Sequence, residues 1–365
     1  MADRNDLTSR IRTLVDDRVA LEARLQNEKG ELPDAAARRY DDQYGAIQRQ
    51  LAALFKEAGD DSQRITIMLE LMRILENRLV YLQNFIVDPS SDSRILAQLV
   101  TKFIDQLISQ RSTVLTSLEA TYYGAVAALY AGDLARARQG FSNAAASEES
   151  DEANDIKYKS YVMLGHLSHE ERDYAKAKEL HEQSLRYSQN NNVTAQALAL
   201  KALNSYALQD YDEALHLFEE SLGLFDPDQP FFNSYFYRNA LLFCGAIYFD
   251  RKNHAKAEEF YRRVLDSVEK NSYDYFDALS HLGRIHYAQG KFDEAVAAFE
   301  KAIQSQKFSE NEYIIDTWFW IARSHLKRND HGQARTYLER IASSDVRYEK
   351  KPQAVELLAR MPQAS

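Results

Sequence analysis

Residues 282–302 read LGRIHYAQGKFDEAVAAFEKA, and this stretch decides the fold. Small and apolar residues recur in it at helical spacing on both sides of Gly290 and Lys291. A glycine followed by a polar residue favours a tight turn. The stretch therefore predicts two helices that are joined by a short turn and pack against each other.

The same pattern occurs six times, and a small residue near the start of each second helix marks it. The marker recurs at intervals of 37 to 43 residues, at Ala137, Ala177, Ala214, Ala257, Ala295 and Ala334. A glycine or alanine stands twelve positions before each marker. An aromatic residue or leucine stands four positions after it, except in the second copy, which has His181. Small residues let two helices approach closely, and the large side chain fills the space beside them.

This spacing resembles that of the tetratricopeptide repeat family over residues 118–344. A single helix pair cannot bury its own apolar face, so successive pairs stack and share a core. The resemblance implies an all-α fold, an alpha–alpha superhelix of about six helix pairs. The chain departs from the family in its period, which exceeds the usual ~34 residues, and in lacking most of the prolines that often end a repeat.

The composition agrees with a wholly helical protein. The 365 residues include only 12 Gly and 6 Pro, and no β-branched run alternates with polar residues. The net charge is −10 without a basic stripe, which argues against nucleic-acid binding. The polar first residues and the absence of a long apolar span predict a cytoplasmic protein without membrane insertion. The single cysteine, Cys244, lies in an apolar run and is interpreted as a buried thiol.

Residues 1–59 carry a narrower, heptad-like pattern that predicts a helical hairpin or a coiled coil. Its two seams are Leu7, Ile11, Leu14, Leu21, Leu25 and Leu32, then Tyr40, Tyr44, Ile47, Leu51 and Leu54. The helices either fold back on each other or pair with a second chain, which would make a homo-oligomer. The break between the seams has the chemistry of a turn, and this favours the hairpin.

The segments that flank the repeats are expected to cap them. Residues 60–117 predict two helices with wider apolar stripes, which would cover the first repeat. Residues 345–365 predict a final capping helix and a tail. Such caps are needed because the terminal repeats of a solenoid have no neighbour on one side.

The sequence contains no catalytic, phosphate-binding or cofactor-binding motif. The nearest pattern to a metal site is His166 with His169, which lie three residues apart on one face of a predicted helix. Polar side chains that line the inner surface of the repeats explain these histidines better, so no metal is assigned. The sequence therefore predicts a protein that is not an enzyme and binds no cofactor.

The resemblance also implies a binding groove, because the first helix of each pair lines the concave face in this family. The inward positions carried over to this chain include Tyr122, Tyr130, His166, His169, Tyr206, Phe249, Arg284, Tyr287, Phe319, Arg323 and Lys327. Aromatic residues and arginine favour binding surfaces. The cations among the last positions favour an acidic peptide or protein as the partner.

Two functions fit this pattern. The first is a non-catalytic scaffold or adaptor that holds a peptide or protein partner in the groove. The second resembles bacterial peptide-sensing repeat proteins, in which N-terminal helices move when the repeats bind a peptide. The two differ in a measurable property, because a sensor should become more compact on binding and an adaptor should change little.

Overall fold

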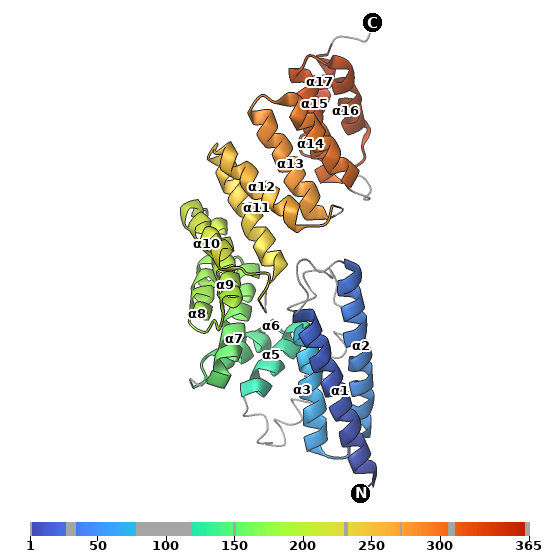
Figure 1. Ribbon diagram of the computed structural model, residues 1–365, viewed down its shortest axis with the longest axis vertical. Helices are drawn as coiled ribbons and strands as arrows, with labels where there is room; N and C mark the ends of the chain where they lie inside the picture. Colours follow the sequence, from blue (N-terminus) through green and yellow to red (C-terminus); the bar gives the residue numbers. More distant parts are fainter. Residues whose placement is uncertain are drawn as a thin grey trace. The chain divides into compact units, whose positions relative to one another are not determined.

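The computed structural model describes residues 2–26, 34–77, 118–148, 151–229, 233–270, 272–305 and 311–361. Within these ranges every regular element is an α-helix (Figure 1). The all-α fold predicted from the sequence is confirmed. None of the described helices combines the length and the apolar character that crossing a membrane requires. The chain divides into two compact units, residues 1–237 and 238–365, and each is described by itself.

The described helices between residues 118 and 343 form six consecutive pairs. These pairs are α5 (Leu118–Ala131) with α6 (Leu134–Ala145), α7 (Asp151–Glu170) with α8 (Tyr174–Leu185), α9 (Asn191–Ala207) with α10 (Tyr211–Leu224), α11 (Ser234–Asp250) with α12 (His254–Ser267), α13 (Tyr273–Ala288) with α14 (Phe292–Ser305), and α15 (Glu312–Lys327) with α16 (His331–Ser343). Helices α1 (Ala2–Gln26), α2 (Asp34–Glu57) and α3 (Asp61–Asn77) precede them, and α17 (Lys351–Ala359) follows.

One type of turn joins the helices of every pair. One residue of each turn adopts positive φ. These residues are Gly132, Arg172, Gln209, Lys252, Gly290 and Asn329. The next N–H donates to the carbonyl five residues earlier, as Asp210 does to Ser205 at 2.9 Å, so each first helix ends in a Schellman motif. In five pairs an Asp or Asn side chain then caps the second helix, at Asp133, Asp173, Asp210, Asn253 and Asp330.

The marker alanines lie where the paired helices touch. All six are fully buried. The ring four residues after the marker packs against a glycine of the first helix in three pairs, at Gly165, Gly245 and Gly283. These glycines have no room for a side chain: a Cβ added at Gly283 would lie 2.5 Å from Phe299 Cε1. The two backbones therefore approach as closely as the ring between them allows, which explains why these positions are small.

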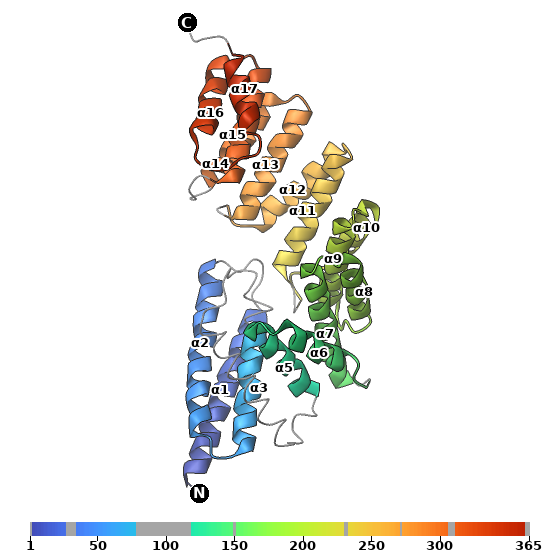
Figure 2. The same ribbon diagram turned by 180° about the vertical axis from the view of Figure 1, so that it is seen from behind.

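The N-terminal helices form a bundle within the chain. Helices α1, α2 and α3 lie side by side in both views (Figures 1 and 2), and α3 also contacts α5. The described seam residues are buried, namely Leu7, Ile11, Leu14, Leu21, Tyr40, Tyr44, Ile47, Leu51 and Leu54. They share one apolar core with the first two helix pairs. Both seams are thus used inside a single chain, in the hairpin arrangement. The side chains of Leu25 and Leu32, and the second helix expected before residue 118, lie outside the described residues.

The second unit has a core of its own. Residues from α13 to α17 form it, together with Tyr348 from the connector that follows α16. Helix α17 follows the last pair, packs against α16 and buries Ala354. Cys244 on α11 is buried, in agreement with its interpretation as a structural thiol.

Candidate functional site

In the second unit, three cations surround one indole ring, that of Trp320 on α15. The guanidinium carbon of Arg323 lies 4.8 Å from the ring centroid, that of Arg284 lies 5.5 Å away, and Lys350 Nζ lies 5.9 Å away. These distances fall within the range of cation–π attraction. We call this group the Trp320 cluster, and it consists of Arg284, Asp316, Trp320, Arg323, Tyr348 and Lys350.

Two helices and one connector supply the cluster. Along α15, residues 316, 320, 323 and 327 follow each other at steps of three and four, which places them on one face. Arg284 reaches this face from α13, where Tyr287 stands one turn further along. Tyr348 and Lys350 come from the connector between α16 and α17.

The carboxylate of Asp316 organises the cluster. Its Oδ1 accepts hydrogen bonds from Tyr348 OH and from Lys350 Nζ, each at 2.7 Å. Its Oδ2 accepts from Trp320 Nε1 at 3.1 Å and from Arg284 Nη2. Burial raises the pKa of this carboxyl, but the bonds from Lys350 and Tyr348 and the charge of Arg284 outweigh burial and lower the pKa below its ordinary value. Asp316 is therefore ionised at neutral pH and holds two of the three cations beside the indole.

Arg323 has a different environment, because no described carboxylate pairs with it. Its guanidinium lies 5.2 Å from the Tyr287 ring centroid and 5.9 Å from that of Phe319, in addition to its contact with Trp320. Aromatic contacts hold a guanidinium through its face and leave the N–H donors of its edge available. Lys327, one turn further along α15, is exposed. The cluster thus combines rigid aromatic surface with unneutralised positive charge.

Several other predicted groove residues lie in ring pairs beside the turns. Their centroid separations are 5.1 to 5.6 Å in the pairs His169–Tyr174, Tyr206–Tyr211, Phe249–His254 and Tyr287–Phe292. In each pair the first ring is half-buried. Tyr122 and Phe319 are instead buried in the cores of their units. Their rings pack against neighbouring helices, so they offer no open surface to a partner. The side chain of Tyr130 lies outside the described residues.

The two histidines that suggested a metal site have different surroundings. His166 is accessible to solvent, but its partial enclosure by protein, and then the nearby His169, lower its pKa to about 4. His169 Nδ1 lies 2.9 Å from Asn204 Oδ1. Because Asn204 Nδ2 donates to the Leu200 carbonyl, this Oδ1 is the acceptor and His169 carries the proton on Nδ1. Among the described side chains, no three potential ligands are arranged to hold a metal ion.

Sequence reasoning found part of the Trp320 cluster and missed the rest. Arg284 and Arg323 were predicted, but Asp316, Trp320, Tyr348 and Lys350 were not. Asp316 and Trp320 share the helical face of Arg323, so their spacing along α15 was an available signal. The other two come from a connector outside the repeat pattern, and no periodicity indicates where such a connector returns.

Comparison with known proteins identifies the repeats. Models of the tetratricopeptide repeat match residues 158–191, 236–307 and 274–345. These matches cover the second repeat and the last three, and they agree with the helix pairs found there. The matched stretches, residues 158–191 and 236–345, are therefore tetratricopeptide repeats. No curated protein matches its sequence.

One solved structure shares the fold at a TM-score above 0.5, and two others are less similar. The apo form of the quorum sensor NprR from B. thuringiensis is 17% identical, with a TM-score of 0.53 over 82% of this chain and 81% of that one. BtubC from P. vanneervenii is 15% identical, with a TM-score of 0.49 over 68% of this chain and 96% of its own. YrrB, a repeat protein with an unusual peptide-binding site, is 15% identical, with a TM-score of 0.42 over 55% of this chain and 90% of its own. The repeat fold supports a general role in protein–protein interaction.

Proposed function

We propose that this chain is a non-catalytic scaffold that binds an acidic segment of a peptide or protein partner at the Trp320 cluster. Arg323 carries the proposal, because its guanidinium is held on aromatic rings and no described carboxylate neutralises it. A half-buried cation without a counter-ion is electrostatically unfavourable, and an anion from a partner would relieve that cost. The half-buried rings of Tyr287 and Trp320 would add the aromatic contact that interaction hot spots commonly use.

The first unit carries a separate set of proposed contact residues. His166, His169 and Tyr206 occupy the first helices of their repeats and remain at least partly accessible. His166 offers a ring edge and a hydrogen-bonding group rather than charge, because its pKa is about 4. Tyr122 and Phe319 are left out of the proposed surface because they are buried.

The proposal assigns no enzymatic activity and no cofactor. The groups of the Trp320 cluster bind charge, and none of them is a nucleophile activated by a neighbouring base. The net charge of −10 supports a protein partner over nucleic acid. A cytoplasmic location is part of the same proposal and derives from the sequence.

Selection from a random peptide display library against the full chain tests this function. We expect the selected peptides to be rich in Asp and Glu. Arg323→Gln should weaken their binding about tenfold or more, which corresponds to roughly 1.4 kcal/mol. The matched control is Arg262→Gln on α12, which removes the same charge from a side chain that is 63% exposed and lies outside the cluster. Selected peptides that bind the Arg323 variant as well as the unchanged chain would contradict the proposal.

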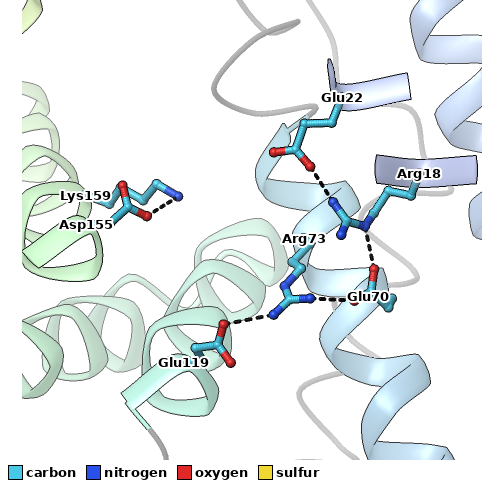
Figure 3. Close-up of polar contacts among 7 residues, drawn as sticks. All are labelled: Arg18, Glu22, Glu70, Arg73, Glu119, Asp155 and Lys159. Carbon is cyan, nitrogen blue, oxygen red and sulfur yellow. Dashed lines mark hydrogen bonds and ion pairs between the residues drawn. The ribbon is translucent and has the colours of Figure 1, made fainter. Parts of the chain in front are cut away.

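A second function, ligand-gated regulation, is favoured by the junction between the N-terminal bundle and the first repeat. Arg18 on α1 pairs with Glu70 on α3, and both side chains are buried. Arg73 bridges Glu70 and Glu119, which lies at the start of α5 (Figure 3). Its Nη1 is 2.6 Å from Glu70 Oε1, and its Nη2 is 2.9 Å from Glu119 Oε1. The buried Arg18–Glu70 pair depends strongly on geometry, and Arg73 connects it to α5 through the more exposed pair with Glu119. A displacement of α5 would therefore be transmitted to the buried pair.

Hydrogen exchange distinguishes regulation from scaffolding. With a saturating peptide from the display selection, a sensor should show changed amide protection in α3 and α5 and a smaller radius of gyration in solution scattering. A scaffold should show changed protection at the binding site and an unchanged radius. Arg73→Gln should weaken the effect on α3 and α5 if the junction transmits it.

Self-association through residues 1–59 is the remaining alternative from the sequence. Since the described seam residues are buried within one chain, we expect the full-length protein to sediment as a monomer at micromolar concentration. A dimer that becomes a monomer when residues 1–59 are removed would support an intermolecular coiled coil instead.

A further inference from the structure

We propose that the Trp320 cluster recognises a phosphoryl group carried by a phosphorylated side chain of the partner. This inference rests on the proposed function, because it specifies which acidic group the same site prefers. It follows from the number of charges in the cluster, from their arrangement between two helices and from the hydrogen-bond donors that they leave unused.

The cluster carries about two more positive than negative charges. It contains the cations Arg284, Arg323 and Lys350, and its one carboxylate, Asp316, is shared by two of them. Outside the cluster, Lys327 adds a positive charge one turn beyond Arg323, and the carboxyls of Asp277 and Glu312 lie within electrostatic reach of Arg284 and Tyr348. A phosphate monoester carries about −1.5 to −2 at neutral pH. A single Asp or Glu side chain would neutralise only half of the excess.

The positive charge is concentrated between α13 and α15. Arg284 extends from α13 to Asp316 on α15, and Arg323 extends from α15 over Tyr287 on α13, so both guanidinium groups bridge the same two helices. Lys350 joins them through the carboxylate of Asp316. Cations held this close repel one another, and a compact dianion relieves that repulsion more than separate carboxylates on neighbouring residues would.

Unused donors favour the same ligand. Among the described residues Arg323 makes aromatic contacts only, so its planar fork of N–H groups remains available for bidentate binding of phosphate oxygens. In the described structure, Arg284 Nε is a buried donor without an acceptor, which adds to the positive potential of the site. Asp316 cannot accept a further hydrogen bond from Arg323 or from Arg284 Nε, because each of its two oxygens already accepts two hydrogen bonds.

Three peptide sets that differ at one position test the preference. Each set carries a fluorescein label and four degenerate positions on either side of a fixed centre, which is phosphoserine, glutamate or serine. Fluorescence polarisation with the full-length chain measures binding. We expect the phosphoserine set to bind at least fivefold more tightly than the glutamate set and more than tenfold more tightly than the serine set. Arg323→Gln should abolish the difference, Arg323→Lys should retain part of it, and Arg262→Gln should preserve it.

A small probe gives an independent measurement at the same site. Both tryptophans of the chain, Trp318 and Trp320, lie on α15, so their fluorescence reports on the cluster. At constant ionic strength, phenyl phosphate should produce a saturable change that benzoate produces only at higher concentration. Melting temperatures of all variants establish that each of them is folded.

The outcomes separate this inference from the function beneath it. Equal binding of the phosphoserine and glutamate sets, lost in both cases with Arg323→Gln, would overturn phosphoryl recognition and leave acidic-partner binding intact. Binding that is independent of Arg323 in every set, with no saturable effect of phenyl phosphate, would overturn both.

Discussion

The second and fifth repeats place the same packing device at equivalent positions and fill it with different side chains. In the second repeat Gly165 faces His181, and in the fifth Gly283 faces Phe299. A Cβ added to either glycine would meet the opposing ring at 2.4 or 2.5 Å. Both rings are essentially inaccessible to solvent. The backbone arrangement is therefore the same whether the ring is polar or apolar.

The neighbouring positions of the two repeats have diverged in charge. Where the second repeat has His166 and His169, the fifth has Arg284 and Tyr287. The pKa of His166 is about 4, so this ring is uncharged at pH 7, whereas the fifth repeat contributes the cation Arg284 to the Trp320 cluster and places the Tyr287 ring against Trp320. The comparison teaches that volume constrains the buried positions, whereas the adjacent accessible positions can differ in charge without disturbing the packing.

Truncation of the buried ring tests the volume argument most strongly. Phe299→Ala should destabilise the fifth repeat by roughly 3–5 kcal/mol, because it removes a fully buried ring and leaves a cavity. His181→Ala should cost the second repeat less, since the lost packing is partly offset by removal of a buried polar group. Amide exchange of α14 and α8 in the full chain measures the two repeats separately. Equal losses of stability in the two variants would contradict the expected difference between the apolar and the polar ring.

Exchange of the two rings is the next test. His181 Nδ1 is buried and has no acceptor in the described structure. His181→Phe should therefore stabilise the second repeat by about 1–3 kcal/mol, the usual cost of an unsatisfied buried polar group. The reciprocal change, Phe299→His, should destabilise the fifth repeat by a similar amount. A loss of stability in His181→Phe would show that the histidine has a role besides filling space.

The two repeats should also respond differently to pH. Burial, and then His166, lower the pKa of His181 well below its ordinary value, and the pKa of His166 is about 4. Below about pH 6.5 the unfolded chain therefore binds protons that the folded second repeat does not, and this repeat should lose stability as the pH falls from 6.5 towards 4. Above about pH 6.5 these histidines should cause no loss of stability in this repeat.

In the fifth repeat two shifts oppose each other. Burial, and then Arg284, lower the pKa of His281 to about 4, which also destabilises the folded state in acid. Burial raises the pKa of Asp277 to about 6, so the folded state takes up this proton before the unfolded chain does, and acid favours folding. When the pH is lowered from 7 to 5, amide protection should thus fall more in α8 than in α14. His181→Phe should reduce this difference between the two helices.

The smallest expected effect concerns the turns. The second repeat has Arg172 at φ 62°, where the fifth has Gly290 at φ 77°. A side chain in this left-handed region costs about 1–2 kcal/mol, although glycine also loses more entropy on folding. Arg172→Gly should therefore raise the melting temperature slightly, and Gly290→Ala should lower it. Shifts of the same sign in both variants would mean that the two turns are not equivalent.

The sequence determined the elements whose causes are local. A cap such as Asp173 acts on an N–H three residues away, and the small size of Ala295 matters where α14 meets the preceding helix of the same pair. These causes act within about forty residues, so the helix pairs, their turns and the family resemblance could be read from spacing. The heptad seams indicated helices in the same way, but they could not indicate which partner would bury them.

Only the tertiary structure decided which distant groups meet and how deeply they are buried. Periodicity places Tyr122 and Phe319 on the face of a helix, yet neighbouring helices enclose both rings. The Trp320 cluster needs α13, α15 and the connector that carries Lys350, and its order depends on Asp316 accepting donors from all three. The physical reason is that electrostatic interactions depend on distance in space, which the spacing of residues along one helix does not contain.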